Sequence, residues 1–167
     1  AVPSEIVAGG SRLFLETKRF DRVGGQGRVS VVTLSAMNDA YAGVPPAAGH
    51  WPEAIARLAQ QRWVLPATVA QVRDLHWFGR FIANSDMHFG NLSFFRRDDG
   101  TLALAPVYDM LPMLYAPIGS ELHERRFAPP VPEPGQEAAW FAAAEIATAY
   151  WGSVAADLRI TQAFRAT

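Results

Sequence analysis

The 167-residue chain contains no cysteine, which excludes disulfide bonds and thiolate metal sites. Its formal net charge is −1, so no basic excess indicates nucleic-acid binding. A membrane-spanning helix needs about 20 apolar residues, but the most apolar stretch, residues 102–118, contains Asp109 and three prolines. The first residues show no signal-peptide pattern. Because 50% of the residues are hydrophobic and 19% are charged, we expect a globular, cytoplasmic protein without a membrane partner.

Lysine is almost absent, since Lys18 stands alone against fourteen arginines. Enzymes that transfer phosphate from ATP usually hold the phosphates with a lysine, in a P-loop or on a kinase strand. Lys18 lies in a strand pattern with no glycine loop before it. The glycines of residues 24–27 lie between two strand patterns and no helix follows, so we interpret them as a hairpin turn. We therefore expect the chain to lack a complete nucleotide site.

The pattern of apolar residues predicts a mainly α fold with small β-hairpins, in the α+β class, over a single domain of residues 1–167. Alternation predicts strands over residues 11–22 and 28–34, after an irregular lead-in of residues 1–10. Thr33 or Ser35 is placed to cap the first helix, Thr68 the third and Thr161 a short final one. The pattern predicts a short helix over residues 36–41 and three longer helices over residues 52–62, 69–83 and 137–157. A proline-rich surface loop is expected over residues 116–136.

The stretch that organises the chain holds two isolated acids, Asp86 and Asp109, and the amide Asn91 five residues after the first acid. Between Asn91 and Asp109, apolar runs flank an Asp-Gly pair, which predicts a hairpin over residues 92–105. An acid, an amide, a hairpin and a second acid form the layout of a kinase catalytic loop followed by its metal-binding acid.

This layout suits phosphoryl transfer, in which an acid orients the attacking hydroxyl and metal ions neutralise the phosphates. Asp86 fits the base, while the oxygens of Asn91 and Asp109 are ligands that Mg²⁺ prefers. His88 lies between base and amide. Taken alone, Asp86 also fits a helix end, Asn91 a turn and His88 a structural hydrogen bond. Asp109 lies among apolar residues, where burial would need a partner or a metal.

Two segments, NSDMHFGNLSFF and LALAPVYDMLP, resemble the catalytic and metal-binding segments of HipA-type kinases, the toxins of bacterial toxin–antitoxin pairs, and are most similar to the YjjJ-like branch. The segment LETKRFDR resembles the strand that leads from the small lobe of these kinases into the large lobe. The similarity extends over nearly the whole chain from Arg12. It implies a two-lobed kinase-like fold, of which this chain is the mainly helical C-terminal lobe and the N-terminal lobe is absent.

The resemblance also implies an activity, a serine/threonine protein kinase that uses ATP and Mg²⁺. Its protein substrate would be one such as an aminoacyl-tRNA synthetase, and a HipB-like antitoxin would restrain it and link it to DNA indirectly. The implied roles are a catalytic base at Asp86, Mg²⁺ ligands at Asn91 and Asp109, a phosphate neighbour at His88, adenine contacts through the backbone of Lys18 and Phe20, and a ribose contact at Asp21.

Two other classes of function fit the sequence. The chain can serve as a non-catalytic binding module that needs a separate small lobe or an antitoxin, with apolar surface and hairpin edges as the interface. A metal-dependent phosphohydrolase would use the same acids, but it usually needs several clustered His and Asp ligands that the sequence lacks.

Overall fold

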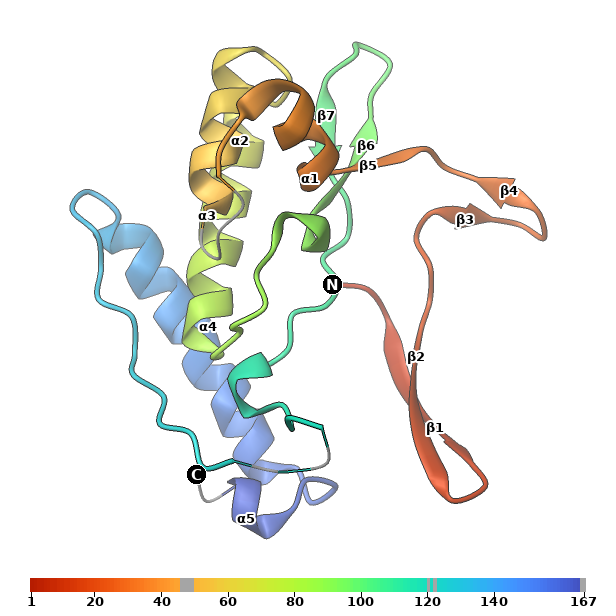
Figure 1. Cartoon of the computed structure of the whole chain (residues 1–167), viewed down its shortest axis with the longest axis vertical. Coiled ribbons are helices and arrows are strands. Elements are labelled where there is room, and N and C mark those ends of the chain that lie inside the picture. Colours follow the sequence, from red (N-terminus) through yellow and green to blue (C-terminus); the bar gives the residue numbers. More distant parts are fainter. Residues whose placement is uncertain (46–49, 120, 122, 166–167) are drawn as a thin grey trace. The chain divides into compact units, whose positions relative to one another are not determined.

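The computed structural model describes residues 1–45, 50–119, 121 and 123–165, and within them it contains five α-helices and three small antiparallel sheets (Figure 1). The predicted α+β class with small β-hairpins is confirmed. The chain divides into two compact units, the first comprising residues 1–69 and 88–109 and the second residues 70–87 and 110–167. Within the described residues, none of the helices combines the length and apolar composition needed to traverse a bilayer.

A hairpin begins the first unit, in which β1 (Ser4–Gly9) pairs with β2 (Arg12–Thr17). The predicted irregular lead-in over residues 1–10 is therefore wrong, because that segment finds its backbone partners in β2. The strand predicted over residues 11–22 is shorter than expected and ends at Thr17. All twelve strand residues are exposed, with Leu13 at 75% and Leu15 at 61%.

A second hairpin joins β3 (Arg22–Val23) to β4 (Gly27–Arg28). The glycines between the strands form a turn, as predicted, and Gly24 has a φ of +59°. Gly27 approaches the carbonyl oxygen of Val23 so closely that a Cβ atom would collide with it. The strand predicted over residues 28–34 is divided between β4 and the next strand.

The third sheet has three strands, β5 (Val31–Thr33), β6 (Ser93–Arg96) and β7 (Leu102–Leu104), in the spatial order β5-β6-β7. The hairpin predicted over residues 92–105 is confirmed. Its turn is stabilised by Asp99, whose Oδ1 accepts hydrogen bonds from the backbone N–H and the hydroxyl of Thr101 at 2.8 and 2.6 Å. The bond from the Thr101 hydroxyl contributes most to lowering the pKa of Asp99.

Helices α1 (Leu34–Met37) and α2 (Trp51–Gln60) contribute to the core of the first unit with residues that are fully buried, Leu34, Trp51, Ile55 and Leu58. Thr33 caps α1, as predicted, because its Oγ1 accepts from the Ala36 N–H at 3.2 Å. The chain then continues as a π-helical turn, η1 (Asn38–Ala42). The buried Asn38 side chain both donates to the Val44 carbonyl and accepts from the Val44 N–H, each at 2.9 Å.

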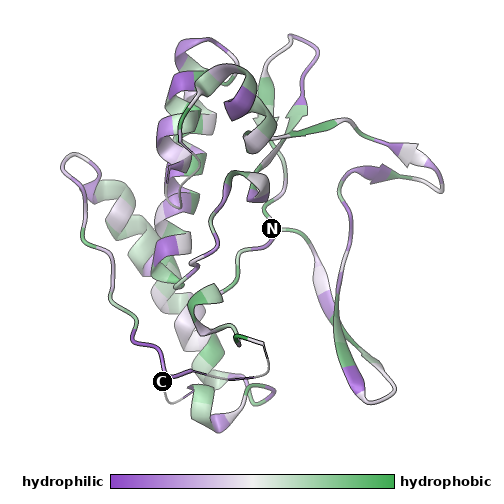
Figure 2. Cartoon of the chain, in the orientation of Figure 1, coloured by the Kyte–Doolittle hydropathy of each residue, from purple (hydrophilic) through white to green (hydrophobic). Residues whose placement is uncertain are grey.

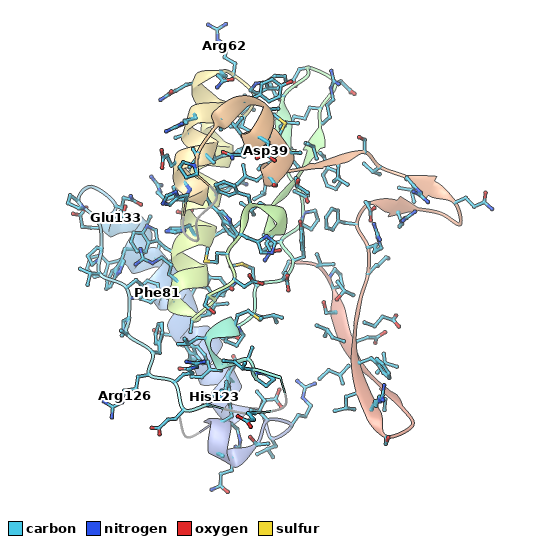
Figure 3. The ribbon with its side chains drawn as sticks, in the orientation of Figure 1. Asp39, Arg62, Phe81, His123, Arg126 and Glu133 are labelled. Carbon is cyan, nitrogen blue, oxygen red and sulfur yellow. The ribbon has the colours of Figure 1, made fainter. Side chains whose placement is uncertain are left out.

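We expect Asn38→Ala to lower the free energy of unfolding by about 2–3 kcal/mol, because it leaves the two backbone groups of Val44 unpaired in a buried site. Urea unfolding monitored by circular dichroism measures the change. The matched control is Asp39→Ala at the exposed neighbouring position (Figure 3), with an expected change within about 0.5 kcal/mol. Equal effects of the two substitutions would contradict the assigned role of Asn38.

The second unit has its core between α3 (Pro66–Phe81) and α4 (Glu137–Ala156). Trp77, Phe81 and Ile82 lie in one buried cluster with the alanines of α4, Ala139, Ala143 and Ala147. These alanines recur every four residues and so form one face of the helix. Figure 2 shows that α4 is hydrophobic along most of its length, and away from this face it exposes 65% of Phe141 and 60% of Ile146.

The helices largely follow the sequence pattern. The second and fourth predicted helices correspond to α2 and α4, within two residues at either end. The third begins earlier than expected, at Pro66, because proline fits the first turn of a helix. The predicted cap at Thr68 is therefore wrong, since Thr68 lies within this helix. Thr161 caps α5 (Gln162–Arg165), accepting from the Phe164 N–H at 3.4 Å. Among the described residues of 116–136, neither helix nor strand occurs, as predicted.

Candidate functional site

The first unit contains a cavity of about 330 Å³ lined by three of the predicted site residues, Lys18, Phe20 and Asp21. Ser93 and Tyr108 line it from the three-stranded sheet and the segment that follows. The Phe20 ring contacts the rings of Phe95 and Tyr108, with centroids 5.7 Å apart in both pairs. The segment predicted to bind a nucleoside therefore packs against the segment that leads to Asp109.

The two residues predicted to contact adenine, Lys18 and Phe20, differ in whether their backbone groups are already hydrogen-bonded. The Lys18 N–H donates to the Pro3 carbonyl at 3.1 Å, so it is already paired. Phe20 makes no backbone hydrogen bond within the described part of the chain. The polar groups available to a base are therefore the N–H and carbonyl of Phe20 and the carbonyl of Lys18.

Asp21 is held by a two-pronged contact with Arg19, whose Nε and Nη2 donate to the two carboxylate oxygens at 2.8 and 2.6 Å. These hydrogen bonds, more than any other interaction, lower the pKa of Asp21 below its ordinary value. Asp21 therefore remains ionised at neutral pH. A carboxylate has about four lone-pair positions, so it can still accept a hydrogen bond from a sugar hydroxyl.

Tyr108 joins the two halves of the predicted metal site. Its Oη donates to the Gly90 carbonyl at 2.7 Å and lies 2.8 Å from the Ser93 Oγ. Asn91 lies between Gly90 and Ser93, and Asp109 directly follows Tyr108. The structure thus brings the backbone of Asn91 and that of Asp109 to neighbouring positions within one unit.

Asp109 has an unusual backbone conformation, with a φ of +57°. Few residues other than glycine adopt this left-handed region, although aspartate and asparagine do so more readily than most. The Asp109 side chain is exposed, so the burial that would have required a partner or a metal does not arise. Asn91, by contrast, is 5% exposed. The free-energy cost at Asp109 therefore comes from its strained backbone conformation and not from desolvation of its carboxylate.

His88 has a local structural role. This is one of the two interpretations that the sequence left open, the other being a neighbour of the phosphates. Its Nδ1 accepts from the Gly90 N–H at 3.0 Å and caps the single turn η2 (Phe89–Asn91). In this arrangement Nδ1 carries no proton, so the neutral ring presents an N–H at Nε2. The His88 carbonyl accepts from the buried Trp51 Nε1 at 3.1 Å. These contacts attach the loop that carries Asn91 to α2.

Asp86 belongs to the second unit, after the end of α3. Ala83 has a φ of +59°, its N–H donates to the Arg80 carbonyl, and the Asn84 N–H donates to the Gly79 carbonyl. This pair of bonds is the Schellman ending of a helix, with alanine in the position usually taken by glycine. The Asn84 Oδ1 then accepts from the Asp86 N–H at 3.0 Å, and the Asp86 side chain is exposed.

Tyr108 and Ser93 were not among the site residues predicted from the sequence. A tyrosine directly before the second acid was the available signal, because a partly buried tyrosine hydroxyl usually has a hydrogen-bond partner. Ser93 had no comparable signal, since its neighbours along the strand are hydrophobic.

We expect Tyr108→Phe to lower the free energy of unfolding by about 1–3 kcal/mol, because both of its hydrogen bonds are lost. Chemical unfolding of the chain measures this change. The matched control is Tyr41→Phe, since the Tyr41 hydroxyl makes no hydrogen bond within the described residues. A Tyr108→Phe effect no larger than that of the control would contradict the proposed connection.

In the part of the chain that the structure describes, no group of three or more His, Asp or Glu side chains is placed to hold a metal. The pair formed by Asn91 and Asp109 offers one amide oxygen and one carboxylate. Such a small set of hard oxygen ligands suits Mg²⁺, which keeps several of its waters and binds substrate phosphates as well.

Comparison with known proteins identifies related chains. The family model described as HipA-like C-terminal domain matches residues 1–164. The chain is 42% identical over 161 residues to Toxin YjjJ of Escherichia coli strain K12, an alignment that covers 96% of this chain and 35% of the toxin. The chain therefore spans about a third of the length of this curated relative.

A solved structure is also similar, a chain of the HipA, HipB and operator DNA complex of the Shewanella oneidensis MR-1 toxin–antitoxin system. The TM-score is 0.51 at 18% sequence identity, over 67% of this chain and 30% of that one. At this identity the similarity concerns the fold.

Proposed function

Because the chain belongs to the HipA-like C-terminal domain family, we propose that it is the C-terminal catalytic lobe of a serine/threonine protein kinase that uses ATP. The observation that carries the proposal is the Tyr108 connection, which holds the Asp109 segment against the loop of Asn91. The same tyrosine lines the cavity beside Phe20 and Asp21.

In this proposal the cavity of the first unit receives the nucleoside of ATP. The backbone of Phe20 and the carbonyl of Lys18 contact adenine, and the Asp21 carboxylate accepts a hydrogen bond from the ribose. The two hydrogen bonds from Arg19 fix the orientation of that carboxylate before the nucleotide binds, which reduces the entropy lost on binding.

Asn91 and Asp109 would hold Mg²⁺ through the amide oxygen and the carboxylate. When bound, the ion neutralises the charge on the phosphates. The exposed carboxylate of Asp109 and the buried amide of Asn91 belong to segments that Tyr108 connects, which supports their assignment as a pair of ligands.

Asp86 would orient the serine hydroxyl of the substrate and accept its proton. The serine oxygen then forms a bond to the γ-phosphorus as the bond to the β,γ-bridging oxygen breaks, and ADP leaves with that electron pair. The Nε2–H of His88 is available to donate to a phosphate oxygen, because its Nδ1 is occupied by Gly90.

The whole protein would be the toxin of a toxin–antitoxin pair that acts in the cytoplasm. A HipB-like antitoxin would restrain it and connect it to DNA, and its substrate would be a protein of translation such as an aminoacyl-tRNA synthetase. The related protein from E. coli is named a toxin, and the similar solved structure contains HipA with HipB and operator DNA. These two names support the partner that we propose.

A single domain over residues 1–167 would act together with an N-terminal small lobe. The hairpin of β1 and β2 supports this division, since an isolated two-stranded hairpin is marginally stable in water. It exposes several large apolar side chains, Ile6, Leu13, Phe14 and Leu15, at 52–75%. A small lobe packed on this hairpin would cover them.

The test is phosphate transfer by the full-length protein and by the 167-residue chain, each given radiolabelled ATP and Mg²⁺. We expect phosphoserine from the full-length protein, and from the chain weak ATP binding by calorimetry with little or no transfer. Missing phosphate contacts cost several kcal/mol of transition-state stabilisation. Transfer by the chain at the full-length rate would contradict the division into lobes, and no transfer by the full-length protein would contradict the kinase.

A non-catalytic binding module is the second candidate, favoured by the same exposed hairpin. In that case the chain would bind a separate small lobe or an antitoxin through β1 and β2, without using Asp86. Binding of such a partner by full-length protein that binds no Mg-ATP in calorimetry would favour this function over the kinase.

A further inference from the structure

The second unit contains a cavity of about 790 Å³ with an aromatic lining, to which α4, α5 and the segment of residues 124–127 contribute. Tyr115 contacts the rings of Trp151 and Phe164 edge to face, with centroids 6.2 and 5.4 Å apart. The Trp151 Nε1 donates to the Phe81 carbonyl at 3.0 Å, which fixes this ring to the end of α3. The volume and the aromatic lining are typical of a binding site.

Arginines line the same cavity. Arg125, Arg126 and Arg165 contribute three guanidinium groups, against the single carboxylate of Glu124. The Arg165 Nε is held by the Ile160 carbonyl at 3.0 Å. Within the described residues, Arg125 and Arg126 make no hydrogen bond or ion pair, and Arg126 extends away from its segment (Figure 3). Two guanidinium groups are therefore available to bind a carboxylate.

A second, smaller cavity of about 260 Å³ shares one lining residue, Phe127, with the first. Its other lining residues include Asn84 and Ser85, the two residues that precede Asp86. Ala128 and Pro130 of the same segment also line it, together with Arg80, Ala83 and Leu114. The surface from the arginines past Phe127 therefore ends beside the acid that we assign as the catalytic base.

We propose that these two cavities, which we call the docking groove, bind the substrate protein through an acidic residue and an aromatic or large aliphatic side chain close to its phosphorylated serine. The inference rests on the proposed function. The carboxylate pairs with Arg125 and Arg126, and the apolar side chain packs on Tyr115, Trp151 and Phe164. Charge complementarity selects this occupant, and the end of the groove at Ser85 brings the serine to Asp86.

The test that needs no catalysis uses two fluorescently labelled random copolymers, glutamate–tyrosine and lysine–tyrosine, with the 167-residue chain. Fluorescence anisotropy is expected to show at least about tenfold tighter binding of the glutamate copolymer at about 0.1 M salt. The double substitution Arg125→Glu with Arg126→Glu is expected to remove about tenfold or more of that affinity.

The matched control is Arg96→Glu with Arg97→Glu, a pair of adjacent exposed arginines that lies in the first unit and changes the net charge equally. It is expected to leave most of the affinity unchanged. Equal binding of both copolymers, or equal losses in both double variants, would overturn the docking groove.

A second arm uses the full-length protein on a serine peptide library. The unmodified protein is expected to prefer acidic residues near the serine, and the Arg125–Arg126 double variant to lose that preference. Copolymer binding without any phosphate transfer would refute the proposed kinase and leave the groove standing. Transfer without an acidic preference would refute the groove and leave the kinase standing.

Discussion

Replacing Asp86 with asparagine in the full-length protein is expected to lower kcat by about 10²–10⁴-fold, the usual contribution of a positioned general base. Asparagine has nearly the same shape but cannot take the proton of the serine hydroxyl. The backbone N–H of residue 86 keeps its hydrogen bond to Asn84, so the loop after α3 should retain its conformation. Rapid-quench measurement of phosphate transfer gives kcat, and calorimetry is expected to show ATP affinity within about threefold of the unmodified protein.

The control for this substitution is Asp74→Asn, which removes an exposed carboxylate from α3, the helix that precedes the Asp86 loop. Its expected effect on kcat is within about twofold, since surface substitutions away from a site change little. A decrease in kcat of less than tenfold for Asp86→Asn would remove Asp86 from the role of base.

Replacing Asp109 with asparagine is expected to weaken Mg²⁺-dependent nucleotide binding by about 10- to 100-fold, corresponding to the roughly 1.5–3 kcal/mol of an interaction with a charged group. Asparagine is the informative substitution because it also tolerates the φ of +57° at this position. Alanine would add backbone strain to the loss of charge and confuse the two effects.

The measurement for Asp109→Asn is calorimetric titration of the full-length protein with a non-hydrolysable ATP analogue, with Mg²⁺ and with a chelator. The two proteins should differ with Mg²⁺ and agree without it. Asp98→Asn, in the exposed hairpin turn before β7, is the charge-matched control. Unchanged affinity of Asp109→Asn in the presence of Mg²⁺ would show that this carboxylate is not a metal ligand.

The local sequence pattern was sufficient to predict most of the helices, because helical spacing and capping depend on residues within a few positions of each other. The helix of Glu137–Ala156 and the caps at Thr33 and Thr161 follow from such neighbours. The glycine turn after Val23 and the Asp-Gly hairpin follow from steric rules that act over four or five residues.

The strand Ser4–Gly9 was missed because its evidence lies in another strand. Its register, with Ile6 opposite Leu15, is a property of the pair and not of either segment. The exposure of Asp109 could not be predicted for a related reason, since apolar neighbours in sequence do not show which direction a side chain faces.

The order of residues was enough to predict the side chains available for chemistry, an acid at 86, an amide at 91 and a second acid at 109, together with the secondary structure near them. The folded chain was needed to find that Tyr108 connects the segments of Asn91 and Asp109, and that Arg125 and Arg126 line an aromatic cavity with residues from α4 and α5. Contacts of this kind join residues distant along the chain, and the periodicity of a single segment carries no information about them.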